Sequence, residues 1–306
     1  MEKKRSKENL PEQDCGRKRI LEKRNAAGLT EAEFLAGYRP SDYERPSVTV
    51  DMLILAMDKS FNGLKTLLIQ RKNHPYIDCY ALPGGFVEID ESAYSAASRE
   101  LEEETGLRNI YLEQLYTMSQ PDRDPRMRVI DIAYMALVPE TKVEGKVKAG
   151  DDAKEALWFD IRFTDRNLIL RNEDRNIEIR YNLKKKSFKN GVIKVENYVP
   201  DLVSDDALAF DHSEIILEGL TRLKNKIEYS DVAFNLVPKE FTLPDLQRVY
   251  EVILGKKLYK TNFREKIIDK VRLLDKKGIS ITGNKSSALY KYCLLYTSDA
   301  ADEARS

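Results

Sequence analysis

Apolar and polar residues follow one another in two rhythms along the chain, and these rhythms predict a protein of mixed α and β structure. Four runs of β-branched and apolar side chains are typical of buried strands: residues 47–55, 64–70, 128–137 and 156–159. Apolar residues at helical spacing predict helices at residues 92–105, with Ser92 as the N-cap, and at residues 213–227. Because strands and helices are mixed irregularly, the expected fold class is α+β.

Two later segments alternate between apolar and polar residues, which is typical of half-buried strands. They are residues 177–182 and 192–198, and Asn190-Gly191 between them is a turn signal. We therefore expect a hairpin insertion at about residues 163–198.

Charged residues dominate the start of the chain. The first 25 or so residues are poor in apolar side chains, so residues 1–44 are expected to form a charged, partly disordered arm. Order is expected to begin at Thr30, which can form a capping box with Glu33. Residues 45–238 are then expected to form the main domain.

Residues 239–292 show the pattern of a second, smaller domain. One helix is expected after the cap Thr242, and another over residues 261–274. A hairpin should follow, with its turn at Gly283-Asn284-Lys285 and with strands at residues 279–282 and 288–292. Helix, turn, helix and hairpin in this order are typical of a winged helix-turn-helix domain, whose second helix enters the major groove of DNA.

The charge of the chain supports this division. The net charge is zero, but residues 45–238 have a balance of −6 and residues 239–293 have a balance of +7. A small basic module is expected to bind the phosphate backbone of DNA, although a solvated surface or a basic oligomerisation module would have the same charge. The expected DNA contacts are polar side chains of the second helix and the wing: Lys260, Asn262, Arg264, Lys266 and Lys285.

The cellular location is expected to be the cytoplasm. No apolar run approaches the roughly 20 residues of a membrane helix, and the N-terminus lacks the apolar segment of a signal peptide. The three cysteines share no motif spacing, so no disulfide framework is expected.

The segment from Gly85 to Leu107 (GFVEIDESAYSAASRELEEETGL) ends in a glutamate-rich helix. At 100° per residue, Glu100, Glu103 and Glu104 fall within an arc of about 100°. Three carboxylates on one face repel one another unless a cation neutralises them, and oxygen ligands favour Mg²⁺ or Mn²⁺. The alternative is a surface helix whose glutamates are solvated.

Two residues can brace these carboxylates. Arg99 lies one turn before Glu103 and can form a bidentate pair with a carboxylate. Glu91 precedes the helix at a place where it can meet the same arginine.

The complete 23-residue pattern resembles the Nudix box, the signature of hydrolases that act on a nucleoside diphosphate linked to another group. The resemblance implies a Nudix α/β/α sandwich with a mixed sheet. It implies metal ligation by Glu100, Glu103, Glu104 and the carbonyl of Gly84, and catalytic roles for Glu103, Arg99, Glu91 and Asp152. The general base stays open between a box glutamate and three later acids, which are alternatively ordinary loop residues: Asp151, Asp152 and Glu155.

The substrate contacts are expected to be arginines. Arg126 and Arg128 lie in a proline-stiffened stretch after the box, and Arg71 follows the second strand; the alternative is a solvated loop. With the run Ala-Phe-Asp-His at residues 209–212, this loop resembles the ADP-ribose pyrophosphatase-like branch, and especially the Nudix-related transcriptional regulators. His212 itself is expected to be a helix-start or packing residue.

Residues 241–267 resemble the C-terminal module of the same regulators, so the resemblance covers residues 45–292. It implies an ADP-ribose-type ligand, operator DNA and a homodimer. We expect a Mg²⁺-dependent hydrolase of ADP-ribose or a related nucleotide, fused to a DNA-binding module and also acting as a regulator. The alternative is a non-catalytic, ADP-ribose-sensing repressor of NAD or sugar metabolism.

The end of the chain has a different character. Residues 293–303 (CLLYTSDAADE) resemble a translated sequencing-adapter tail, so residues 293–306 are expected to be non-native.

Overall fold

The computed structural model describes residues 23–139, 141 and 153–293, and expectations for other residues lie outside it. Contacts divide the chain into two units, residues 1–45 and residues 46–306. In the first unit, helix α2 (Glu31–Gly37) begins after Thr30, and both hydrogen bonds of the predicted capping box are formed. A 3-10 turn, η1 (Pro40–Asp42), follows it.

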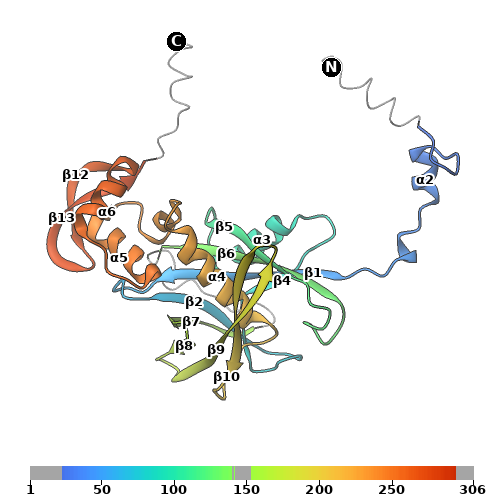
Figure 1. Ribbon diagram of the computed structural model, residues 1–306, viewed down its shortest axis with the longest axis horizontal. Helices are drawn as coiled ribbons and strands as arrows, with labels where there is room; N and C mark the ends of the chain where they lie inside the picture. The colour runs from blue at the N-terminus through green and yellow to red at the C-terminus, as the bar shows by residue number, and fades with distance from the viewer. Residues whose placement is uncertain (1–22, 140, 142–152, 294–306) are drawn as a thin grey trace, which may run out of the picture. The chain divides into compact units, whose positions relative to one another are not determined.

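The second unit is built around a mixed ten-stranded sheet, whose main path runs β10-β9-β8-β7-β2-β1-β6-β5 (Figure 1). Strand β3 pairs with β2, and β4 pairs with β1. The pair β1–β6 is parallel and the other pairs are antiparallel. The strands are β1 (Ser47–Met57), β2 (Leu64–Arg71), β3 (Tyr80–Ala81), β4 (Gly84–Phe86), β5 (Tyr111–Met118), β6 (Val129–Val138), β7 (Ala153–Phe163), β8 (Asn167–Asn172), β9 (Ile177–Asn190) and β10 (Ile193–Leu202).

Alternate residues of β1 face opposite sides of the sheet and divide the core into two clusters. Ile54 packs on one side with Ala96 of helix α3 (Ala93–Thr105). Leu53 and Leu55 pack on the other side with helix α4 (His212–Lys226). A Cβ atom on Gly219 of α4 would lie 2.1 Å from Leu53 Cδ2, so this glycine lets α4 approach the sheet closely. The two helices therefore cover opposite faces.

After η3 (Val232–Leu236), the chain forms a small domain of two helices and a three-stranded sheet. The helices are α5 (Leu243–Leu254) and α6 (Lys260–Ile267), followed by η4 (Ile268–Lys270). The sheet has the order β11-β13-β12, with β11 (Phe241–Thr242), β12 (Val271–Ser280) and β13 (Gly283–Tyr292). Buried Asp245 accepts hydrogen bonds from Thr242, Ser280 and Thr282, which tie the start of α5 to the hairpin. This is the winged helix arrangement expected from the sequence.

The winged helix shares a hydrophobic core with the main sheet. One cluster contains Leu53 of β1, Leu220 of α4 and Leu246 of α5. In addition, Arg248 of α5 donates hydrogen bonds to the carbonyl of Phe61 (3.0 Å) and to Asn62 Oδ1 (2.7 Å) in the turn between β1 and β2. The winged helix and the main sheet are thus joined by a continuous hydrophobic core and by these hydrogen bonds.

The sequence prediction was wrong in the second half of the winged helix. The helix predicted over residues 261–274 ends at Ile267, and Val271 begins β12, where it pairs with Tyr292. Cross-strand hydrogen bonds satisfy this backbone, and they override the local helical spacing of its apolar residues. The turn of the hairpin lies at residues 281–282, so Lys285 belongs to strand β13 and its side chain lies outside the description.

The predicted hairpin at residues 177–198 is present as β9 and β10, with longer strands. It continues the main sheet through β8, a strand that the sequence did not predict, and β5 was missed as well. Within the described residues, no helix is both long and apolar enough to cross a membrane.

Candidate functional site

Helix α3 presents its glutamates at three depths. The helix begins after Ser92, whose hydroxyl accepts the amide hydrogen of Ser95, and it ends at Gly106 with φ 68°. Glu104 is buried and Glu100 is half-buried, whereas the side chain of Glu103 is 60% exposed. The predicted face therefore runs from the protein interior to solvent.

Arg99 lies at the centre of this carboxylate face. Its guanidinium forms a bidentate pair with Glu91 (2.8 and 3.3 Å), a bond with Glu100 (2.8 Å) and a longer contact with Glu103 (3.5 Å). It also donates to the carbonyl of Phe86 (3.3 Å), which ties the helix to strand β4. The structure thus brings Arg99 to Glu91, as the sequence predicted, with Glu91 as the bidentate partner, and it adds a contact with Glu100.

The same contacts shift the acidities of these groups. The hydrogen bonds from Arg99 lower the pKa of Glu91. Burial raises the pKa of Glu100, and the charges of Glu103 and Glu91 reinforce that direction against the opposing effect of Arg99. Glu100 is therefore a carboxylate whose charged form gains from an added cation.

Two glycines allow the backbone of β4 to approach its neighbours. A Cβ atom on Gly85 would lie 2.1 Å from Glu100 Oε1, and one on Gly84 would lie 2.2 Å from the carbonyl oxygen of Val50. A larger residue at position 84 would clash with the backbone of β1, whereas one at position 85 would displace the carboxylate of Glu100. Glycine at position 84 thus permits the close contact between β4 and β1.

The described residues include no group of three or more His, Cys, Asp or Glu side chains at metal-binding spacing. The donors nevertheless fit a divalent cation in their chemistry. They are hard oxygen ligands, Glu100 gains from a neighbouring cation, and the backbone of Gly85 lies against it. Glu100, Glu103, Glu104 and the carbonyl of Gly84 would hold such an ion.

The three arginines predicted to bind substrate all make contacts within the chain. Arg126 forms a bidentate pair with Asp124 and lies over the ring of Phe86, 5.9 Å from its centroid, which places it beside the box. Arg128 donates to the carbonyls of residues 119 and 120. Arg71 donates to the carbonyl of residue 75 and lies 5.0 Å from the ring centroid of Phe210.

A second arginine cluster, which the sequence did not predict, is centred on Arg123 in the same loop. Arg123 is 4% exposed and forms a bidentate pair with Asp211 (2.9 and 2.6 Å), and it lies 3.7 Å from Asp51. His212 accepts the amide hydrogen of Leu82 at Nδ1 (2.8 Å) and places Nε2 3.3 Å from Asp51. His212 is buried at the start of α4, as the sequence predicted.

Asp131 completes this cluster. It is fully buried on β6 and accepts a hydrogen bond from the hydroxyl of Thr49 (3.0 Å). Burial and the charge of Asp51 raise the pKa of Asp131 well above its usual range. Burial also disfavours the charge of Asp51, but His212 and Arg123 outweigh burial and lower its pKa. In the sequence, the Ala-Phe-Asp-His run was the feature that pointed to this cluster. Its aspartate, Asp211, pairs with an arginine 88 residues away.

The later acids that are candidates for a general base are only partly covered by the structure. Asp151 and Asp152 lie outside the described residues. Glu155 lies on β7 and is paired with Arg175 at 2.8 Å. Its role as a base therefore stays a prediction.

The predicted DNA contacts of α6 fall into two groups. Lys260, Asn262 and Arg264 are exposed on the helix. Lys266 instead turns toward the protein body, where it donates to the carbonyl of Glu228 (2.8 Å) and lies 5.6 Å from the ring centroid of Tyr250. Lys260 and Arg264, one turn apart, thus share one face of α6, whereas Asn262 lies one turn before Lys266 and lines the same hollow.

Comparison with known sequences matches both parts of the chain. Residues 45–177 match the NUDIX domain family, and residues 233–292 match the family described as the NrtR DNA-binding winged helix domain. The chain is 31% identical to the ADPR responsive transcriptional repressor NtrR of Acinetobacter baylyi, over 87% of this chain and 89% of that protein. It is 44% identical to the ADP-ribose pyrophosphatase of Methanocaldococcus jannaschii over 46% of this chain and 77% of that protein.

Two solved structures are similar to this chain across both the Nudix sheet and the winged helix. A MutT/nudix family protein from Enterococcus faecalis matches with a TM-score of 0.70 and 32% identity, covering 93% of this chain and all of that one. Shewanella oneidensis NrtR, crystallised with a 27mer DNA, matches with a TM-score of 0.59 and 27% identity, covering 80% of this chain and 93% of that one.

Proposed function

The chain belongs to the NrtR family, in which a Nudix domain precedes a winged helix domain, and on this premise we propose that it is a DNA-binding transcriptional repressor that responds to ADP-ribose. The observation that carries the proposal is the match to the Acinetobacter repressor over both domains. It supports the ADP-ribose-sensing repressor, which was the alternative expectation from the sequence, better than the hydrolase that was expected first.

The proposed ligand site lies at the box and the adjoining loop. Arg126 beside Phe86, Arg128, and Arg71 beside Phe210 offer cationic and aromatic groups to a nucleotide with a pyrophosphate. Helix α6 is the proposed reading element, with the exposed side chains of Lys260, Asn262 and Arg264 as its contacts. Lys266 is a weaker candidate because it is engaged with the protein body.

The test uses the full chain and duplex DNA from its own gene neighbourhood. We expect binding by fluorescence anisotropy at low salt, and weaker binding when ADP-ribose is added. Charge reversal of Lys260 and Arg264 should abolish the anisotropy change, whereas reversal of Lys186 and Lys189, which are exposed on β9, should leave it intact. Binding that survives the first pair, or that ignores ADP-ribose, would contradict the proposal.

Hydrolysis of ADP-ribose is the second candidate, and the braced carboxylates of the complete box favour it. When bound, Mg²⁺ or Mn²⁺ would neutralise the pyrophosphate and activate a water molecule. The chain itself would contribute Arg99, which holds Glu91 and Glu100 in place, and Glu103, whose exposed carboxylate can reach a ligand. AMP release from ADP-ribose, lost in Glu103→Gln, is the expected result; no release by the wild-type protein would exclude this candidate.

We also propose that the protein acts as a homodimer, because paired winged helices fit paired half-sites on DNA. Sedimentation analysis should show a dimer at micromolar concentration. A monomer under those conditions that still binds DNA would contradict this proposal.

A further inference from the structure

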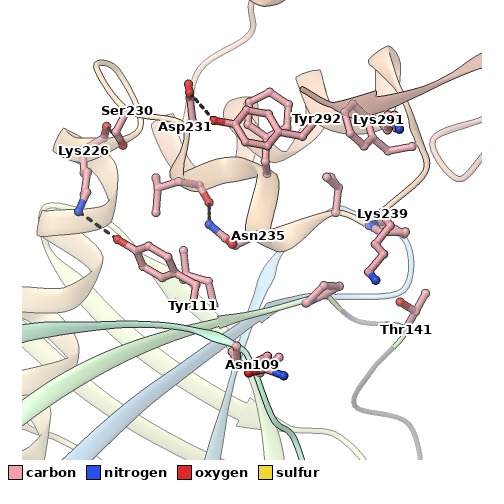
Figure 2. Close-up of a pocket in the computed structure, with 18 residues that line it drawn as sticks. Asn109, Tyr111, Thr141, Lys226, Ser230, Asp231, Asn235, Lys239, Lys291 and Tyr292 are labelled. Carbon is pink, nitrogen blue, oxygen red and sulfur yellow. Dashed lines mark hydrogen bonds between the residues drawn. The ribbon is translucent and has the colours of Figure 1, made fainter. Parts of the chain in front are cut away.

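A cleft of about 790 Å³ lies between the main sheet and the winged helix (Figure 2). One wall is formed by Tyr111 at the start of β5, Leu137 of β6 and Asn109, two residues before β5. The opposite wall comes from the segment after α4, seen in Figure 2 as Ser230, Asp231 and Asn235, and from Lys239 and the end of β13. Its volume lies within the range of about 300–1,000 Å³ that small-molecule sites occupy, commonly at domain junctions.

The charges along this cleft favour an anion. Among the described residues, its lining includes Lys226, Lys239 and Lys291 but a single carboxylate, that of Asp231. That carboxylate already accepts hydrogen bonds from Lys270 (2.5 Å) and Tyr292 (2.8 Å). In the described part of the chain, neither Lys239 nor Lys291 forms an ion pair, so two positive charges remain for a ligand.

Lys226 is the third cation, and the protein holds it in place. Its ammonium donates to Tyr111 Oη (3.0 Å) and to Glu113 (2.6 Å). Burial lowers the pKa of Lys226, but these two hydrogen bonds outweigh burial and raise that pKa overall. The residue therefore stays charged at the edge of the cleft.

The inner wall is aromatic. The rings of Phe234 and Tyr292 lie 4.3 Å apart, and Phe234 also contacts Phe241 at 5.7 Å. Phe234 and Tyr292 are half-buried, and both line the cleft. A planar ring can pack against such a wall with its charged group at the lysines.

This cleft is separate from the box. The residues that line it adjoin the core cluster of α4 and the winged helix, whereas α3 packs on the opposite face of the sheet. A ligand in the cleft would contact β5 on one side and β13 of the winged helix on the other. It would thus join the two parts of the protein at a place that no residue of the box reaches.

We propose that this cleft is a second binding site, which takes a small organic anion that carries a phosphate or carboxylate group and one planar ring. The proposal does not require that the box bind ADP-ribose.

The test titrates the full chain with AMP by isothermal titration calorimetry. Saturable binding is expected, and Lys239→Glu with Lys291→Glu should weaken it about tenfold or more, because two charge-assisted contacts become repulsive. Lys186→Glu with Lys189→Glu makes the same charge change on the exposed hairpin and should leave AMP affinity within about twofold of the wild type. Ribose 5-phosphate, which lacks the ring, should bind more weakly than AMP.

Two results would overturn the proposal. One is the absence of saturable AMP binding by the wild-type chain up to millimolar concentration. The other is equal AMP affinity in the two double variants, which would place the nucleotide elsewhere on the protein. All four lysines are at least partly exposed, so both variants are expected to fold.

Discussion

Two arginines in this protein sit among acidic side chains, and they do so in different surroundings. Arg99 contacts Glu91, Glu100 and Glu103, and its side chain is 30% exposed. Arg123 contacts Asp211 and Asp51, and its side chain is 4% exposed. The first cluster is partly open to solvent, and the second is almost fully buried.

Burial changes the role that a guanidinium has among carboxylates. An exposed cluster can exchange its partners for water or a ligand at little cost, so it suits binding. A buried cluster loses far more when a partner is removed, because the remaining charge cannot be solvated. We therefore expect the Arg123 cluster to govern stability and the Arg99 cluster to govern chemistry.

The largest expected effect follows Arg123→Ala. This change removes the buried partner of Asp211, while Asp51 keeps His212 at 3.3 Å, and it should lower the free energy of unfolding by about 3–5 kcal/mol. Urea denaturation measures this loss. Arg166→Ala removes an exposed arginine from the turn between β7 and β8 and serves as the control, with an expected change within about 0.5 kcal/mol. Equal stability losses in the two variants would show that burial does not set the contribution of an arginine in this protein.

Asp211→Asn keeps the shape of the side chain but removes its charge. The two hydrogen bonds to Arg123 become weaker, and the expected loss is about 1.5–3 kcal/mol by the same denaturation experiment. A loss as large as that of Arg123→Ala would mean that Asp211 alone neutralises the buried guanidinium.

Arg99→Ala should have the opposite profile. Water can replace the lost contacts, so the free energy of unfolding should change by about 1 kcal/mol or less. ADP-ribose binding, and AMP release if the protein hydrolyses it, should fall about tenfold or more because Glu91 and Glu100 lose their brace. A stability loss as large as that of Arg123→Ala would show that the Arg99 cluster is structural as well.

Asp131→Asn tests the buried cluster through the dependence of stability on pH. The pKa of Asp131 is raised in the folded protein, so the folded state binds the proton more tightly than the unfolded chain. Stability from this group is full below the unfolded pKa, near 3.9, and falls as the pH rises through the folded value. The asparagine variant should lack this decline when thermal unfolding is followed from pH 4 upward; an unchanged decline would point to another group.

Local sequence patterns predicted the parts of the fold that local interactions determine. Strands β1 and β2 and helices α3 and α4 were found within a few residues, because their caps and apolar spacing lie within each segment. Strand β12 was missed because its partner, β13, outcompetes a helical pattern that extends to Leu274. Strands β5 and β8 gave weak signals of their own and are held by neighbouring strands.

The candidate site followed the same rule. The Arg99 cluster could be predicted because all its members lie within 13 residues of one another. The Arg123 cluster could not, since Asp51, Arg123, Asp131 and Asp211 meet through the pairing of β1 with β6 and the packing of α4. Only their acidic and basic types were visible, and such residues are common on surfaces.

The hydrophobic cluster that spans β1, α4 and α5 has a consequence for how the molecule unfolds. A domain with a core of its own can melt independently of its neighbour. Here Leu246, Val249 and Ile253 of α5 share one cluster with Leu53 and Leu220, so neither part can open without exposing the apolar surface of the other. The two parts are therefore expected to melt in one cooperative transition, and cutting the chain at Pro238 should leave two fragments that aggregate.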